Sequence, residues 1–174
     1  MARIILNMAV TLDGFIARPD GGVEWCFTDQ DYGFSAFRQT IGTILMGRAT
    51  YEVVLSFGEL PYQGAECFVF SRNLKDSNSE HIRVLREIDP DYVRQMKAGR
   101  DRDIWLMGGG EVTGQFLELG LLDELQLAIH PVLLGEGIAA FGGYSFPPER
   151  LKLVSTRTFN TGLLLAVYRI LNPN

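Results

Sequence analysis

Three consecutive glycines, Gly108, Gly109 and Gly110, constrain this chain more than any other feature. They follow an apolar run at 104–107 that is typical of a buried strand, and they open a run at 110–119 that is typical of a helix. Glycine at such a junction lets a bound group approach the backbone closely, and the free N–H groups of a helix start attract anions. We therefore predict a phosphate or pyrophosphate site here, although a tight strand-to-helix connection also uses glycine.

A second junction of the same kind lies at 46–52, where MGRATYE follows an apolar strand and precedes a helix. Two anion sites in one small domain favour a ligand with several phosphates, such as a nucleotide cofactor. Arg48 either holds one of these phosphates or pairs with a carboxylate near the helix start. With Gly47 and Thr50 beside it, we favour the phosphate.

Strand-like and helix-like runs alternate along most of the chain. We expect strands over 3–10, 43–46, 67–70, 82–85, 104–107 and 125–129, and helices over 29–40, 50–57, 89–97 and 110–119. Asp29 is the expected N-cap of the first helix. Two β-rich runs, 151–159 and 163–171, flank Asn160-Thr161-Gly162 and predict a hairpin. The expected fold is α/β, with a mostly parallel central sheet, an antiparallel C-terminal hairpin and helices on both faces.

Composition narrows the possible functions. The 174 residues contain no repeat or linker, which predicts one domain over 1–174, and a net charge of −5 argues against non-specific nucleic-acid binding. No apolar run is long enough to cross a membrane, and the N-terminal run is too short for a signal peptide, so we expect a cytoplasmic protein. Cys26, Cys67, His81 and His130 show no metal-binding spacing, so no metal is expected.

A set of motifs in a fixed order resembles a known family. It comprises TLDGFIA at 11–17, LMGRATYE at 45–52, FSR at 70–72, MGGG at 107–110, and Asp123-Glu124 before a strand that ends near Pro131. Together these motifs resemble the dihydrofolate reductase superfamily over nearly the whole chain. The branch that they resemble more closely is the C-terminal reductase domain of the bifunctional deaminase–reductase of riboflavin biosynthesis. The zinc deaminase motif is absent from this sequence.

The resemblance implies NADPH as the cofactor, bound across the carboxyl ends of the strands. It places Gly47, Arg48, Ala49 and Thr50 at one phosphate. It places Ser71 and Arg72 at the adenosine 2′-phosphate, where a guanidinium and a hydroxyl select NADPH over NADH. It places the pyrophosphate at Met107, Gly108, Gly109, Gly110, Glu111 and Val112. It places the nicotinamide at Ala9 and Ile16. By similarity alone, the terminal strands and the segment 134–137 suggest a homodimer.

The substrate side is less determined. Asp31 has the same spacing from Gly47 as the substrate-binding acid of dihydrofolate reductases has from its own Gly-Arg pair. It is our candidate catalytic acid, and its alternative role is to stabilise a helix start. Asp13 either accepts hydrogen bonds from the amides of Gly14 and Phe15 or faces the substrate. Trp25, Phe34 and Tyr51 are further candidate substrate contacts, although burial alone would explain such aromatic residues.

We therefore expect an NADPH-dependent reductase that transfers hydride to a C=N or C=O bond of a small heterocyclic substrate. A ribosylaminopyrimidine of riboflavin biosynthesis is the leading substrate, and dihydrofolate is the alternative. A nucleotide-binding module without reductase turnover is the alternative from another class.

Overall fold

The fold is described by a computed structural model over residues 2–58, 64–75, 81–143, 145 and 150–171. Its elements in chain order are β1 (Ile4–Thr11), β2 (Phe15–Ala17), α1 (Phe34–Thr40), β3 (Ile41–Gly47), α2 (Arg48–Ser56), β4 (Glu66–Phe70), β5 (Ile82–Leu85), α3 (Pro90–Ala98), β6 (Asp103–Gly108), α4 (Gly110–Glu118), β7 (Glu124–His130), β8 (Ile138–Ala139), β9 (Leu151–Thr158) and β10 (Leu164–Ile170). None of the helices in these ranges is long and apolar enough to span a membrane.

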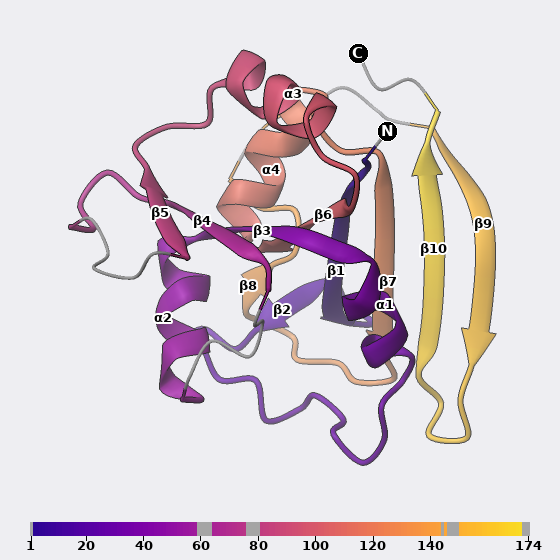
Figure 1. The fold of residues 1–174 in the computed structure, drawn as a ribbon. Helices are drawn as coiled ribbons and strands as arrows, with labels where there is room; N and C mark the ends of the chain where they lie inside the picture. Colours follow the sequence, from indigo (N-terminus) through magenta and orange to yellow (C-terminus); the bar gives the residue numbers. More distant parts are fainter. Residues whose placement is uncertain (1, 59–63, 76–80, 144, 146–149, 172–174) are drawn as a thin grey trace.

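Eight strands form one sheet in the order β5-β4-β3-β6-β1-β7-β10-β9. The six strands from β5 to β7 are parallel to one another, whereas β10 is antiparallel to both β7 and β9. The β9–β10 hairpin forms one edge of the sheet (Figure 1). Because parallel strands share one direction, the segments that follow β1, β3, β4, β6 and β7 all leave the sheet at the same edge. This is the edge where we predicted the ligand site.

Helices cover both faces of the sheet, which confirms the predicted fold class. On one face, Val93 of α3 and Phe116 of α4 pack in a core cluster with alternate residues of β1 and β6. On the other face, Phe37 of α1 and Tyr51 of α2 pack with Ile5 and neighbouring strand residues. The central strands are therefore buried on both sides, which explains their continuous apolar runs.

The predicted helix over 29–40 is wrong in its first half. α1 begins only at Phe34, and Asp29 does not cap it. Tyr32 and Gly33 have φ angles of 53° and 87°, and this left-handed pair interrupts any helix at that point. The other predicted elements match the observed ones to within a few residues at each end. The short antiparallel pair formed by β2 and β8 was not predicted.

Candidate functional site

The glycine run lies where β6 ends and α4 begins, at the carboxyl edge of the sheet. Gly109 precedes α4 with φ 44° and ψ 152°, a combination outside the regions that residues with a Cβ adopt. Gly110 lies so close to the carbonyl oxygen of Ala139 that a Cβ there would overlap it. Glycine is thus required at Gly109 by conformation and at Gly110 by the close approach of another backbone segment.

The second predicted anion site lies directly beside the first. α2 begins at Arg48 and follows Gly47, the last residue of β3. A Cβ built on Gly109 would lie 3.4 Å from Oγ1 of Thr50, and one built on Gly47 would lie 2.9 Å from Cγ2 of Val112. The structure therefore brings the starts of α2 and α4 close together.

Both helix starts retain unsatisfied N–H groups. Within the described ranges, neither α2 nor α4 has a side chain that caps its first turn. The backbone amides of the first turn have no partner inside the helix, and the helix dipole adds positive potential at the same place. Two such helix starts side by side can bind neighbouring phosphate groups. Ala49 and Glu111 are exposed in the first turns of α2 and α4.

Arg48 takes part in the carboxylate pairing that was its alternative role. Its Nη1 lies 2.7 Å from Oε1 of Glu52, one turn further along α2, and both side chains are about half exposed. An exposed ion pair of this kind contributes little stability, so a ligand phosphate can compete for the guanidinium. The phosphate role of Arg48 stays a prediction.

Ser71 and Arg72 follow β4 at the same edge of the sheet. The buried Ser71 hydroxyl accepts hydrogen bonds from the amides of Leu74 (2.9 Å) and Asn73 (3.3 Å), which shapes a tight turn. Arg72 is exposed on this turn. Its guanidinium is therefore accessible to a ligand, while Ser71 fixes the backbone that carries it.

The predicted nicotinamide contacts lie near the middle of the edge. Ala9 is half-buried in β1, where it pairs with Ala128 of β7. Ile16 is half-buried in β2 and packs against the larger core cluster. Met107, which we assigned to the pyrophosphate, is half-buried in the neighbouring strand β6. The strand order places the ends of β6, β1 and β7 next to one another. A flat ring bound there would rest on these strand ends.

Asp13 joins two loops of the carboxyl edge. Its carboxylate accepts hydrogen bonds from the Thr11 hydroxyl (2.6 Å) and from the amides of Leu134 (3.0 Å) and Gly135 (2.8 Å). The predicted donors, Gly14 and Phe15, are wrong, because the carbonyl and hydroxyl oxygens of Thr11 accept from those amides instead. The Thr11 hydroxyl, followed by the Gly135 amide, holds the pKa of the Asp13 carboxyl below its ordinary value. Asp13 thus connects the loop after β1 to the loop after β7.

Asp31 lies before α1 rather than in its first turn. Its carboxylate accepts from the Ser35 hydroxyl (2.6 Å), the Ser35 amide (3.0 Å) and the Gly33 amide (3.1 Å). The Ser35 hydroxyl is the main reason that the pKa of the Asp31 carboxyl lies below its ordinary value. A group that delivers a proton near neutral pH needs a raised pKa, so this environment favours the structural role of Asp31.

Two of the three predicted aromatic contacts are buried. Tyr51 lies in the core cluster under α2, and Trp25 packs edge-on against His130 with ring centroids 5.2 Å apart. Phe34 is 37% exposed and packs edge-on against Trp105. Of the three rings, Phe34 alone has a substantial exposed surface on which a ligand can rest.

His130 is buried at the end of β7. Its Nδ1 is 3.0 Å from the carbonyl oxygen of Ala128, and burial lowers the pKa of the imidazole. In the part of the chain that the structure describes, Nε2 of His130 and Nε1 of Trp25 are buried without a hydrogen-bond partner.

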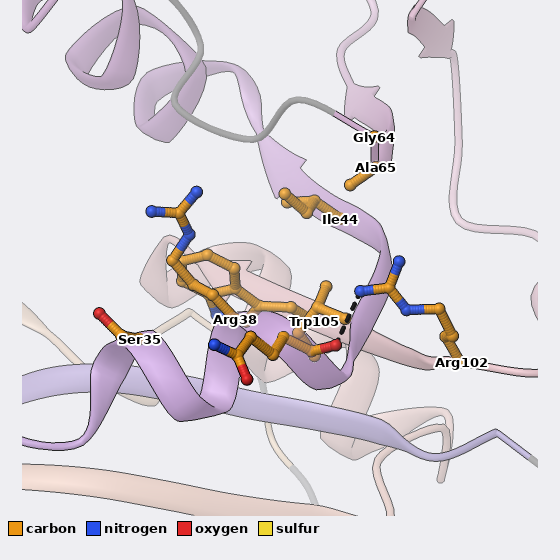
Figure 2. Close-up of a pocket in the computed structure, with 9 residues that line it drawn as sticks. Ser35, Arg38, Ile44, Gly64, Ala65, Arg102 and Trp105 are labelled. Atoms are coloured by element: carbon orange, nitrogen blue, oxygen red, sulfur yellow. Dashed lines mark hydrogen bonds between the residues drawn. The ribbon is translucent and has the colours of Figure 1, made fainter.

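A pocket of about 350 Å³ opens between α1 and the sheet (Figure 2). Figure 2 shows Arg38 of α1 at the left of the pocket and Arg102, which precedes β6, at its right. Nη2 of Arg102 donates to the carbonyl oxygen of Gln39 at 2.8 Å, which ties it to the end of α1. Sequence reasoning missed this pocket, because no motif links an arginine of α1 to one that precedes β6. Its lining residues Ile41, Ala65 and Arg102 lie at the amino ends of β3, β4 and β6, so this pocket is at the opposite edge of the sheet from the glycine run.

Comparison with known proteins gives an independent view of this arrangement. The protein named Uncharacterized protein YyaP of Bacillus subtilis (strain 168) is 39% identical over 95% of this chain and 94% of its own length. A Shewanella sp. PV-4 structure named for riboflavin biosynthesis has a TM-score of 0.85 at 24% identity, covering 98% of this chain and 99% of its own.

A Thermotoga maritima diaminohydroxyphosphoribosylaminopyrimidine deaminase/5-amino-6-(5-phosphoribosylamino)uracil reductase has a TM-score of 0.74 at 20% identity. It covers 97% of this chain and 56% of its own. At these identities the two solved structures show a shared fold. The family described as the RibD C-terminal domain matches residues 60–165 of this sequence. The chain therefore belongs to the RibD C-terminal reductase family.

Proposed function

We propose that this protein is an NADPH-dependent reductase that acts on a small heterocyclic substrate. The observation that carries the proposal is the pairing of the α2 and α4 starts, which are so close that a Cβ built on Gly109 would lie 3.4 Å from Oγ1 of Thr50. Such a pair of uncapped helix starts suits the phosphates of a dinucleotide. Family membership supports the same cofactor, because the related Thermotoga maritima protein is named as a reductase.

Three groups of residues at the carboxyl edge of the sheet would each bind a different part of the cofactor. The helix starts at Gly47 and Gly109 would hold the pyrophosphate region, and the turn of Ser71 and Arg72 would hold a ribose 2′-phosphate. Ala9 and Ile16 would border the nicotinamide. When bound, the reduced nicotinamide supplies a hydride to the carbon of a C=N or C=O bond, and a proton completes the reduction at nitrogen or oxygen.

The chain's own contribution is to position the two reactants and to exclude water. Because Asp31 remains ionised through its hydrogen bonds with Ser35 and Gly33, water is the better source of the proton. Asp13 holds the loops that border the nicotinamide position by fixing Leu134 and Gly135. These residues organise the site without taking part in bond-making.

A phosphate-bearing pyrimidine is the leading substrate, because the family of this chain includes a protein named as a 5-amino-6-(5-phosphoribosylamino)uracil reductase. The pocket of Arg38 and Arg102 is not assigned to this substrate. It lies at the amino ends of β3, β4 and β6, at the opposite edge of the sheet from the proposed nicotinamide position. Dihydrofolate is less well supported, because the carboxylate of Asp31 is already engaged by Ser35.

The test is to measure binding of NADPH and NADH by calorimetry for the wild type, Arg72→Ala and a control, Arg94→Ala. Arg94 is an exposed arginine of α3 that pairs with Asp91. Arg72→Ala should weaken NADPH binding by about 1–3 kcal/mol, the range for a charge-assisted contact, and should leave NADH binding unchanged. The control should bind both cofactors as the wild type does.

Three other outcomes have definite meanings. Equal losses for both cofactors would show that Arg72 does not contact the 2′-phosphate. Absence of binding of either cofactor would refute the reductase proposal. Binding of NADPH without its oxidation across pterins and pyrimidine nucleotides would favour a nucleotide-binding module. The homodimer stays a prediction, and the exposed edge strand β9 is where we expect a second copy.

A further inference from the structure

Arg86 lies immediately after β5 and contacts the neighbouring turn that follows β4. Its Nη1 donates to the carbonyl oxygen of Leu74 at 2.5 Å and lies 3.4 Å from the carbonyl oxygens of Ser71 and Arg72. One guanidinium nitrogen therefore contacts three carbonyl oxygens of the turn formed by residues 71–74. No sequence motif pointed to Arg86.

Ser71 makes further hydrogen bonds within and beyond this turn. The Ser71 hydroxyl accepts from the amides of Asn73 and Leu74, and the Ser71 amide donates to the carbonyl oxygen of Leu85 at 2.9 Å. The carbonyl groups thus bind Arg86, while two of the amides bind Ser71. This double set of contacts fixes the backbone that carries the exposed Arg72 side chain.

The charge of Arg86 matters as much as its geometry. Carbonyl oxygens carry partial negative charge, and three of them close together would repel a phosphate. A guanidinium bound to all three cancels this repulsion and adds a permanent positive charge beside Arg72.

We propose that Arg86 is a positioning residue that sets the cofactor preference: it holds the 71–74 turn so that Ser71 and Arg72 bind a ribose 2′-phosphate. This inference rests on the proposed function, because it assumes that the turn binds the 2′-phosphate. Arg86 acts through the carbonyl groups of the turn and needs no contact with the cofactor.

The experiment compares two small ligands, adenosine 2′,5′-bisphosphate and adenosine 5′-monophosphate, by calorimetry on the full chain. Their affinity ratio isolates the 2′-phosphate, and a general loss of stability would not change it. The variants are Arg86→Gln, Arg86→Lys and the control Arg83→Gln. Arg83 lies in β5, three residues before Arg86, and pairs with Glu66 at 3.6 Å, so its replacement removes an equal charge without touching the turn.

We expect Arg86→Gln to lower bisphosphate affinity about tenfold or more, in line with the loss of charge-assisted contacts, and to leave monophosphate affinity unchanged. Arg86→Lys should recover only part of the ratio, because an ammonium cannot reproduce the planar donor geometry. Arg83→Gln should preserve the ratio. If circular dichroism shows that Arg86→Gln is unfolded, the ratio for Arg86→Lys decides the question.

The outcomes separate this inference from the proposed function. If the wild type does not prefer the bisphosphate, the cofactor proposal fails whatever Arg86 does. If the wild type prefers it and the Arg86 variants keep the full ratio, the role of Arg86 is refuted while the cofactor proposal stands. An equal loss for both ligands, or an equal effect of Arg83→Gln, would also refute it.

Discussion

Replacement of Gly109 by alanine gives two separate effects whose sizes follow from the structure. At φ 44° and ψ 152° an alanine is strained by about 1–3 kcal/mol, and the stiffer unfolded chain offsets about 0.4–1 kcal/mol of this cost. We expect a net loss of about 1–2 kcal/mol in the free energy of unfolding. For a chain of this length, that loss lowers Tm by roughly 2–8 °C.

The effect on cofactor binding has a different origin. The new methyl group would lie 3.4 Å from Oγ1 of Thr50, an ordinary contact, so the free protein can accommodate it between the two helix starts. The same space is where we expect the pyrophosphate to approach the backbone. Loss of its charge-assisted contacts should weaken NADPH binding by about 1.5–3 kcal/mol, which is about 10–150-fold.

The matched control is Gly21→Ala in the loop after β2. Gly21 has φ +89° and no neighbouring atom within 4 Å of a built Cβ, so alanine there carries a similar backbone strain without filling a contact. Urea denaturation and calorimetric titration of both variants separate stability from binding. If Gly109→Ala is destabilised like Gly21→Ala but binds NADPH as tightly as the wild type, the glycine run is a structural connection and the pyrophosphate lies elsewhere.

Two further predictions concern individual side chains. Methotrexate should bind weakly, because Ser35 and Gly33 already engage the Asp31 carboxylate. In competition calorimetry, Asp31→Asn should leave the methotrexate affinity unchanged. Tight binding that is lost in the variant would make dihydrofolate the leading substrate. Burial lowers the pKa of the His130 imidazole in the folded protein. Below about pH 6.5 the unfolded chain therefore binds a proton at His130 that the folded chain does not bind. The free energy of unfolding should fall as the pH is lowered through this range. In urea denaturation at pH 7.5 and 5.5, His130→Asn should show a smaller loss than the wild type, and an equal loss would exclude His130 as the cause.

Most of the fold could be predicted because its signals are local. The apolar runs of β1, β3 and β6 are long enough to identify buried parallel strands, and the Asn160-Thr161-Gly162 turn marks the hairpin. The start of α1 could not be predicted, because Asp29 and Asp31 both look like helix caps in sequence. The positive φ angles at Tyr32 and Gly33 decide the boundary, and Tyr32 gives no sign of such a conformation.

The candidate site was predictable in its backbone parts and less so in its side-chain parts. Glycine marks the positions where chain or ligand must come close, so Gly47 and Gly109 were identified from local sequence. The contacts of Asp13 with Leu134 and of Arg86 with Leu74 join segments that are distant or irregularly spaced in sequence. Such contacts depend on strand order, which places β1 beside β7 and β4 beside β5.

The chain as a whole is negatively charged, whereas its proposed cofactor site is suited to a negatively charged ligand. The hydrogen bonds of the site explain this difference. The chain carries a net charge of −5, yet its carboxyl edge is suited to a polyanion. The Asp13 and Asp31 carboxylates accept hydrogen bonds from backbone amides there, and Glu52 is paired with Arg48. Remote carboxylates are screened over about 8–10 Å at physiological salt. A bound phosphate therefore meets mainly the uncapped amides of α2 and α4, and Glu111 of the α4 first turn is the carboxylate that opposes it.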